Sequence, residues 1–254
     1  MPVLWKGPMQ KSAKKLPPLF SYTGNYAYTD WTDPDGTVHF ELALLSSGTL
    51  TFTRVVPEID LTLVGAGQKG GTGYRSGTYA YGGKGGDGGD IERQTGVAVS
   101  TGTSYSVQIG VNDANSQSGD EDTTFGSYSS ANGQAGKTGP SGAEAGGPGG
   151  LKTAAGQADD GEAPFADGTS ALYPNVLFGA PGGGGAAFSS GGYSGSASSG
   201  GETGGGDGGT SGNLSGNAGA ANRGAGGGGG WGGNQGYVGG SYGGSGIALI
   251  RDAV

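Results

Sequence analysis

The uneven placement of glycine constrains this chain more than any other feature of its sequence. Glycine supplies 64 of the 254 residues, and only four of these, at positions 7, 24, 36 and 48, precede residue 65. Average usage is about 7%, and each glycine inside a helix costs about 1 kcal/mol relative to alanine. From residue 65 onward glycine recurs every few positions, so an α-helix of useful length cannot form. The chain is therefore expected to be all-β, with essentially no α-helix.

Short segments with alternating apolar side chains indicate where the strands lie. Between Thr37 and Leu45 an apolar residue occurs at every second position, as in a half-buried β-strand. The last such segment, Ile247 to Arg251, is too short to bury its side chains alone, so it must return to the N-terminal sheet. We expect strands in three parts of the chain, about 22–64, 91–128 and 247–251, packed as a β-sandwich.

Two glycine-rich insertions, about 65–90 and 133–246, separate these strands. A flexible Gly/Ser linker is one interpretation, but linkers seldom carry residues such as Phe165, Phe178 and Trp231. The other is polyglycine II, a helix like polyproline II with about three residues per turn and no internal hydrogen bonds. Its buried backbone groups must bond to neighbouring helices, and glycine lets such helices approach closely. We therefore expect a packed bundle of polyglycine II helices on the β-sandwich base.

Charge divides the chain into a basic head and an acidic body. Residues 1–20 carry four lysines and no acid, so with a net charge of −8 overall the remainder carries −12. An acidic body does not suit nucleic acid, which needs clustered Lys and Arg, and no apolar run reaches the roughly 18 residues of a membrane span. We expect 1–20 to be a flexible docking segment using Trp5, Leu16 and Phe20, and 21–254 to be a single glycine-rich domain.

The sequence around each motif that could indicate ligand binding or catalysis argues against that function. Gly65-Ala-Gly-Gln-Lys-Gly70 matches a dinucleotide fingerprint, but further glycines follow where the phosphate-binding helix must begin. His39 is the single histidine and there is no cysteine, so a triad or a histidine or thiolate metal site is absent. We expect no enzyme activity, no catalytic residues, no cofactor and no metal. A glycosidase-type carboxylate pair and calcium in the acidic loops near Asp120 and Asp159 stay open.

The order of features resembles a known family. A strand ending in Leu63-Val-Gly-Ala-Gly67 is followed by a glycine-rich stretch, then by Ser104 to Val111, Thr124-Phe-Gly-Ser127 and a closing Gly246 to Arg251. This looks like the glycine-rich domain common in bacteriophage tail and receptor-binding proteins, over about residues 45–252. The resemblance implies a β-sandwich base, a bundle of glycine helices, and specificity loops between the glycine runs, here 74–81, 151–178, 188–199 and 213–223.

The resemblance also implies a role. We expect a virion protein on the tail or another exterior surface, an adhesin that presents its loops to a host receptor, either a glycan or an outer-membrane protein. The N-terminus would join another virion protein, and assembly as a homotrimer is left open. The alternative is a structural virion or surface-lattice protein without receptor binding. The tyrosines expected to contact the receptor, or equally to cap or wedge the bundle, are Tyr74, Tyr79, Tyr81, Tyr173 and Tyr193. Arg75 is expected to make a charged contact with the receptor.

Overall fold

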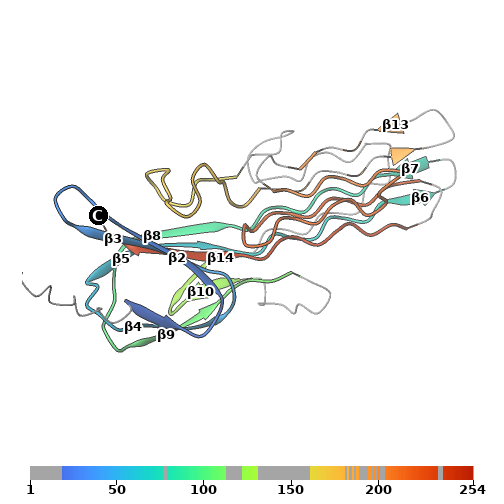
Figure 1. Cartoon of the computed structure of the whole chain (residues 1–254). Coiled ribbons are helices and arrows are strands. Elements are labelled where there is room, and N and C mark those ends of the chain that lie inside the picture. Colours follow the sequence, from blue (N-terminus) through green and yellow to red (C-terminus); the bar gives the residue numbers. More distant parts are fainter. Residues whose placement is uncertain are drawn as a thin grey trace, which may run out of the picture.

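The computed structural model describes most of the chain as one elongated molecule. The described residues are 19–76, 79–112, 122–130, 161–180, 182, 185, 187–188, 194–195, 197, 199–200, 204–233 and 237–253. A base of β-strands occupies one end, and long extended segments run side by side from it to the other end (Figure 1). Among these residues there is no helix, so the all-β prediction is confirmed for the described part of the chain.

Two five-stranded antiparallel sheets form the base. The first has the order β1-β4-β9-β10-β11 and consists of β1 (Phe20–Tyr22), β4 (Gly48–Phe52), β9 (Ser104–Gln108), β10 (Thr123–Phe125) and β11 (Tyr128–Ser130). The second has the order β2-β3-β14-β5-β8 and consists of β2 (Tyr26–Thr32), β3 (Val38–Leu44), β14 (Ile247–Asp252), β5 (Glu58–Val64) and β8 (Ile91–Ala98). The last strand, β14, lies between β3 and β5, which confirms its predicted return to the N-terminal sheet.

The core between the two sheets is made of side chains from alternating positions. Phe40, Leu42 and Leu44 of β3 meet Leu50 and Phe52 of β4 in one cluster of buried residues. The alternation predicted for this segment is correct for these three positions of β3. Val38, which shares the pattern, is 65% exposed at the start of the strand. Burial of these side chains supplies the main driving force for folding of the base.

The outer face of the second sheet is also covered, which the alternating pattern did not indicate. Residues 161–180 cross this face and bury Phe165 and Phe178 against Ala43 and Leu249. Glu41 of β3 lies beneath them, only 1% exposed, and accepts a hydrogen bond from the Ala171 N–H at 2.7 Å. Glu41, on the strand face opposite the predicted apolar face, is therefore buried but hydrogen-bonded, which limits the free-energy cost of burying its carboxylate.

Ion pairs and hydrogen bonds fasten the same segment to the sheet. Thr62 Oγ1 donates to the Pro164 carbonyl at 2.6 Å, and Arg93 pairs with Glu162 at 2.9 Å. Arg251 lies over the Phe165 ring, with its guanidinium carbon 4.2 Å from the ring centroid. The part of the predicted 151–178 receptor loop that the structure describes is thus part of the base, and residues 151–160 lie outside the described residues.

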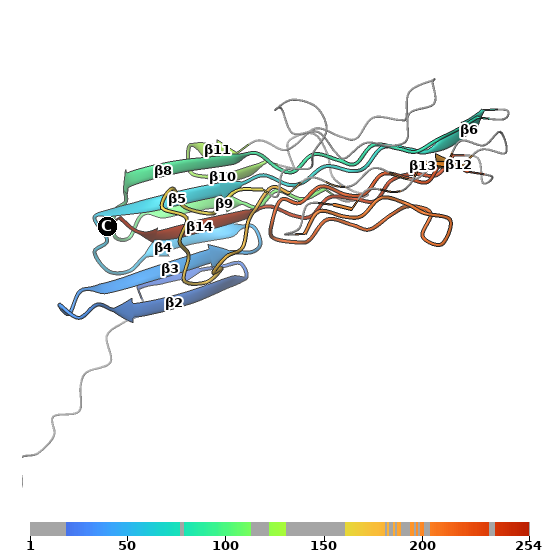
Figure 2. The same cartoon turned by 90° about the horizontal axis from the view of Figure 1, so that it is seen from above.

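Beyond the sheets, glycine-rich segments pair through backbone hydrogen bonds that recur at every third residue. Along one antiparallel pair, Gly67 N–H donates to Gly244 O, Gly70 N–H to Ser241 O and Gly73 N–H to Val238 O, at 2.8–2.9 Å. Residues 65–73 continue β5, and residues 237–246 lead into β14 (Figure 2). The bundle is therefore built directly onto strands of the base.

One segment, 224–231, lies in the middle of the bundle. Its backbone exchanges hydrogen bonds with six surrounding parts of the chain, namely 68–71, 83–89, Ala180, 206–209, 214–217 and 241–245. A Cβ atom added at Gly226 or Gly228 would lie within 3.0 Å of a carbonyl oxygen of a neighbouring segment, a distance that real Cβ atoms do not show. Only glycine allows this approach, so the sequence composition and the packing explain each other.

Two short hairpins lie at or overlap two of the loops that the family resemblance implies between the glycine runs, 74–81 and 188–199. They are formed by β6 (Tyr74–Ser76) with β7 (Tyr79–Tyr81), and by β12 (Ala187–Phe188) with β13 (Ser194–Gly195). Both lie at the end of the bundle farthest from the C-terminus (Figures 1 and 2). The aromatic residues in these stretches favour strands, and this preference produces local β-pairing where glycine is less dense.

Candidate functional site

The β6–β7 hairpin lies at the end of the molecule farthest from the C-terminus, here called the distal end (Figure 1), and its strands contain Tyr74, Tyr79 and Tyr81. Its register pairs Tyr74 with Tyr81 and Ser76 with Tyr79, which leaves a two-residue connection of Gly77 and Thr78. Cross-strand aromatic pairs of this kind stabilise short antiparallel strands by a few tenths to about 1 kcal/mol. The hairpin therefore has its own stabilising contact at the position where the bundle ends.

Three tyrosine rings stack in a row at this tip. The Tyr74 and Tyr81 ring centroids are 4.8 Å apart with 26° between the ring planes, and Tyr74 and Tyr237 are 5.7 Å apart with 15° between them. Exposure rises along the row, from 7% for Tyr81 to 78% for Tyr237. The innermost ring is therefore held in the bundle, and the outermost ring is open to solvent.

The register of the bundle brings Tyr237 to this place. Gly67, Gly70 and Gly73 bond in turn to Gly244, Ser241 and Val238, so each step of three along one segment matches a step of three back along the other. The next residues in this register are Tyr74 and Tyr237. An isolated bridge between Gly73 and Val238 continues the pairing to the tip.

Sequence reasoning did not single out Tyr237, because this residue lies outside the loops that the family resemblance implies. The signal that could have found it is this antiparallel register, which needs the pairing of two segments more than 160 positions apart.

A stacked aromatic row whose outermost ring is exposed is suited to recognising flat apolar surfaces. The face of an aromatic ring carries negative potential, so it attracts polarised C–H groups such as those on one side of a sugar ring. A tyrosine has few rotatable bonds and is already held by its neighbours, so little conformational entropy is lost on binding. The tip can therefore offer a binding face without rearrangement.

The structure brings four of the predicted receptor-contact residues into this one hairpin. Tyr74, Arg75, Tyr79 and Tyr81 all lie on β6 or β7. Tyr81 is buried by the stack and supports Tyr74, as the alternative prediction of a packing role had it. For Arg75 and Tyr79 the structure describes the strand positions but not the side chains.

The remaining predicted residues lie elsewhere. Tyr173 is at the base, where its ring meets Phe178 edge-on at 5.6 Å and burial raises the pKa of its hydroxyl. Phe20 is the first residue of β1 and is 8% exposed in the sandwich core, so its side chain offers little surface to a docking partner. Tyr193, Trp5 and Leu16 lie outside the described residues.

His39, the single histidine of the sequence, lies between two carboxylates of the base. Its Nδ1 lies 2.6 Å from Asp252 Oδ2, its Nε2 lies 3.2 Å from Asp33 Oδ2, and its ring stacks on Trp31 at 5.4 Å. The hydrogen bond to Asp252 raises the pKa of His39, and the charges of Asp252 and Asp33 add to this against the opposing effect of partial burial. Both ring nitrogens of His39 therefore lie beside a carboxylate oxygen.

Two further observations concern the described residues as a whole. No three His, Asp or Glu residues among them gather in a way that could hold a metal ion. No helix in this part of the chain is long and apolar enough to cross a membrane.

A family model described as a glycine-rich domain matches residues 45–252. The chain belongs to this glycine-rich domain family. The match includes the distal hairpin, the bundle and the closing strand β14, whereas β1, β2 and β3 precede it. No curated protein and no solved structure matches this glycine-rich domain.

Proposed function

We propose that this glycine-rich domain is an adhesin on the exterior of a bacteriophage virion, at a tail tip or fibre tip, that binds a host-surface receptor through its distal end. The observation that carries the proposal is the row of Tyr81, Tyr74 and Tyr237, with its outermost ring 78% exposed at the end farthest from the base. The resemblance of the sequence to glycine-rich tail and receptor-binding domains gives the setting.

The bundle suits the task of holding such a tip. We propose that its segments are polyglycine II helices, because their hydrogen bonds recur every three residues and run between segments rather than within them. Residues 224–231 exchange backbone hydrogen bonds with six surrounding segments, which supports the same assignment. A support of this kind would keep the tip at a fixed distance from the virion and leave its surface side chains free to vary.

The opposite end is the natural place for attachment. Residues 1–18 precede the base, so the lysine-rich segment with Trp5 and Leu16 would join another virion protein there. The receptor would be a glycan or an outer-membrane protein, and a trimer is compatible with attachment through the base. No role for nucleic acid, membrane insertion or catalysis forms part of this proposal.

Binding to bacterial cells tests the distal site. Fluorescently labelled protein would be incubated with a panel of bacterial strains and counted by flow cytometry, and a strain that binds the unchanged protein would be chosen. Tyr237→Ser should lower binding at least about tenfold, since loss of a central aromatic contact typically costs 2 kcal/mol or more. Tyr26→Ser removes a tyrosine that is 48% exposed on β2 at the base and should bind as the unchanged protein does.

The structural alternative makes a different prediction in the same experiment. If Tyr237→Ser and Tyr26→Ser bind cells equally, the distal row is not the receptor site. If no strain in a broad panel binds and virions carrying Gly228→Ala fall apart more readily, a decoration or lattice role takes the place of the adhesin.

A further inference from the structure

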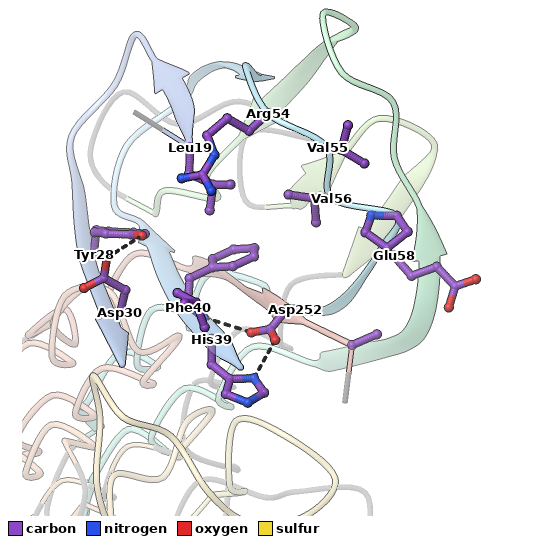
Figure 3. A pocket seen from close by; sticks show the side chains of 13 residues that line it. Leu19, Tyr28, Asp30, His39, Phe40, Arg54, Val55, Val56, Glu58 and Asp252 are labelled. Carbon is purple, nitrogen blue, oxygen red and sulfur yellow. Dashed lines mark hydrogen bonds and ion pairs between the residues drawn. The ribbon is translucent and has the colours of Figure 1, made fainter. Parts of the chain in front are cut away.

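A pocket lies at the base, at the end where β14 finishes. Its volume is about 300 Å³, and it opens between the 53–57 loop on one side and β2 and β3 on the other (Figure 3). Pockets of this size can bury one large side chain or a small ligand. The distal hairpin is at the other end of the molecule, so this pocket is separate from the proposed receptor site.

The inner wall of the pocket is apolar. Phe40 and Val56 are buried members of the sandwich core, and Leu19 packs against that core. At the rim, the side chains of Val38 and Val55 are 65% and 85% exposed. Such a run of apolar surface from core to rim is what a partner side chain covers most favourably.

Charge around the pocket is predominantly negative. Asp30, Glu58 and Asp252 contribute three carboxylates to the lining, against the guanidinium of Arg54 and the imidazole of His39 (Figure 3). Asp252 is already engaged with His39 and with the Phe40 N–H at 2.9 Å. Within the described residues, Glu58 and Arg54 take part in no ion pair. The pocket therefore favours an occupant that combines an apolar group with positive charge.

The chain has a segment of that composition immediately before Leu19 in the sequence, and Leu19 lines the pocket. Residues 1–18 contain four lysines and no acid, together with Leu4, Trp5 and Leu16. They join the described structure at Leu19, which lines the pocket and whose carbonyl accepts a hydrogen bond from the Thr53 N–H at 3.0 Å. The C-terminal end of this segment is therefore joined to a residue of the pocket wall.

We propose that the pocket binds the chain's own N-terminal segment, with Trp5 against the apolar wall and lysines beside Asp30 and Glu58. Trp5 lies 14 residues before Leu19, and a flexible chain of that length has an end-to-end distance of roughly 20 Å. A short tether of this kind gives an effective concentration in the millimolar range. An intrinsic dissociation constant of about 0.1 mM would then keep the segment bound about ten times more often than free.

Self-binding changes what attachment requires. A virion partner that takes residues 1–18 must first displace them from the pocket, so weakening the pocket should strengthen capture by the partner. This inference does not depend on the receptor site, and its failure would leave the proposed adhesin role unaffected.

Site-resolved proteolysis of the full chain tests the proposal. Endoproteinase Lys-C cleaves after lysine only, and mass spectrometry reports the cleavage rate after Lys6, Lys11, Lys14 and Lys15 separately from the other lysines. The double variant Asp30→Arg with Glu58→Arg introduces no new Lys-C site and should raise the rate at these four lysines about tenfold. Glu92→Arg, on β8 at the opposite edge of the same sheet, makes a charge reversal away from the pocket and should leave the rate unchanged.

Because the double variant changes two residues of the base, a second variant tests the proposal without changing the base. Trp5→Ala leaves every pocket residue in place and should also raise cleavage several-fold, and added salt should raise it in the unchanged protein because exposed charge pairs are screened. Equal cleavage rates in all four proteins would overturn the proposal. Protection that grows with protein concentration would also overturn it, because the segment would then occupy the pocket of a second copy.

Discussion

In the base, side chains fill the space between two sheets, and Leu42, Phe52 and Ile59 are fully buried there. In the bundle, the backbone itself fills the space, and Gly226 and Gly228 are buried with no side chain to contribute. Both regions exclude water, but the base does so by burying apolar groups and the bundle by pairing peptide groups with neighbouring segments.

This difference predicts that the base and the bundle respond in opposite ways to substitutions that remove or add side-chain atoms. A core made of side chains is weakened when atoms are removed, because a cavity remains. A bundle of closely packed backbones is weakened when atoms are added, because a Cβ at Gly226 or Gly228 would collide with the backbone of a neighbouring segment. The same single-methyl change can therefore be mild in one region and severe in the other.

Removing a large side chain from the base should have the largest effect. Phe52→Ala is expected to lower the free energy of unfolding by about 4 kcal/mol, because Phe52 is fully buried between the sheets. Phe52→Leu keeps most of the volume and should cost about 1 kcal/mol. Urea denaturation of both variants measures the difference, and equal losses would mean that the base does not depend on filling its core.

Adding one methyl group to the centre of the bundle should come next. Gly228→Ala is expected to cost about 3 kcal/mol, since the new Cβ would crowd the Asp207 carbonyl and strain the bonds that Gly228 makes with Asn217 and Ser241. Gly239→Ala is the matched control, because a Cβ there meets nothing within 4 Å.

Amide hydrogen exchange over residues 224–231 locates the effect of these bundle variants. Faster exchange in Gly228→Ala and unchanged exchange in Gly239→Ala are expected. Exchange at random-coil rates in the unchanged protein would mean that the paired bundle does not exist in solution.

The smallest expected effect is a dependence of stability on pH, and it should arise in the base and not in the bundle. The pKa of His39 is raised in the folded protein, chiefly by its hydrogen bond to Asp252. Its stabilising contribution is therefore fully present below the ordinary histidine pKa of about 6.5 and is lost as pH rises through the raised value.

Thermal unfolding at two pH values measures this contribution. His39→Gln should lower the Tm more at about pH 5.5 than at about pH 8.5, whereas the Tm loss caused by Gly228→Ala should not change between them. An equal loss for His39→Gln at both pH values would show that the charge of His39 has no role.

The extent to which the sequence predicted this molecule also differs between the regions. Alternating apolar residues located the strands of the base, and β14 was correctly assigned to the N-terminal sheet, because these signals are local or follow from burial. The covering of the outer face by 161–180 was not foreseen, since nothing near Glu41 in sequence indicates that Ala171 will reach it.

The distal hairpin shows the same contrast between local signals, which the sequence reveals, and contacts between distant segments, which it does not. Tyr74, Arg75, Tyr79 and Tyr81 were singled out because they lie in the loop 74–81 that the family resemblance implies. Tyr237 was not, because its place beside Tyr74 depends on the register of two distant segments. The placement of Tyr173 at the base has the same cause, since its contact with Phe178 belongs to a segment folded onto the sheet.

The direction of the paired segments has a mechanical consequence. Residues 65–73, 82–90 and 237–246 run along the long axis and continue covalently into β5, β8 and β14. Their hydrogen bonds lie across that axis, so a pull between the hairpin end and the base acts on whole rows of them in shear. Bonds loaded together in shear resist far more force than bonds opened one at a time. A domain of this construction should keep its length under tension until many of those bonds break at once.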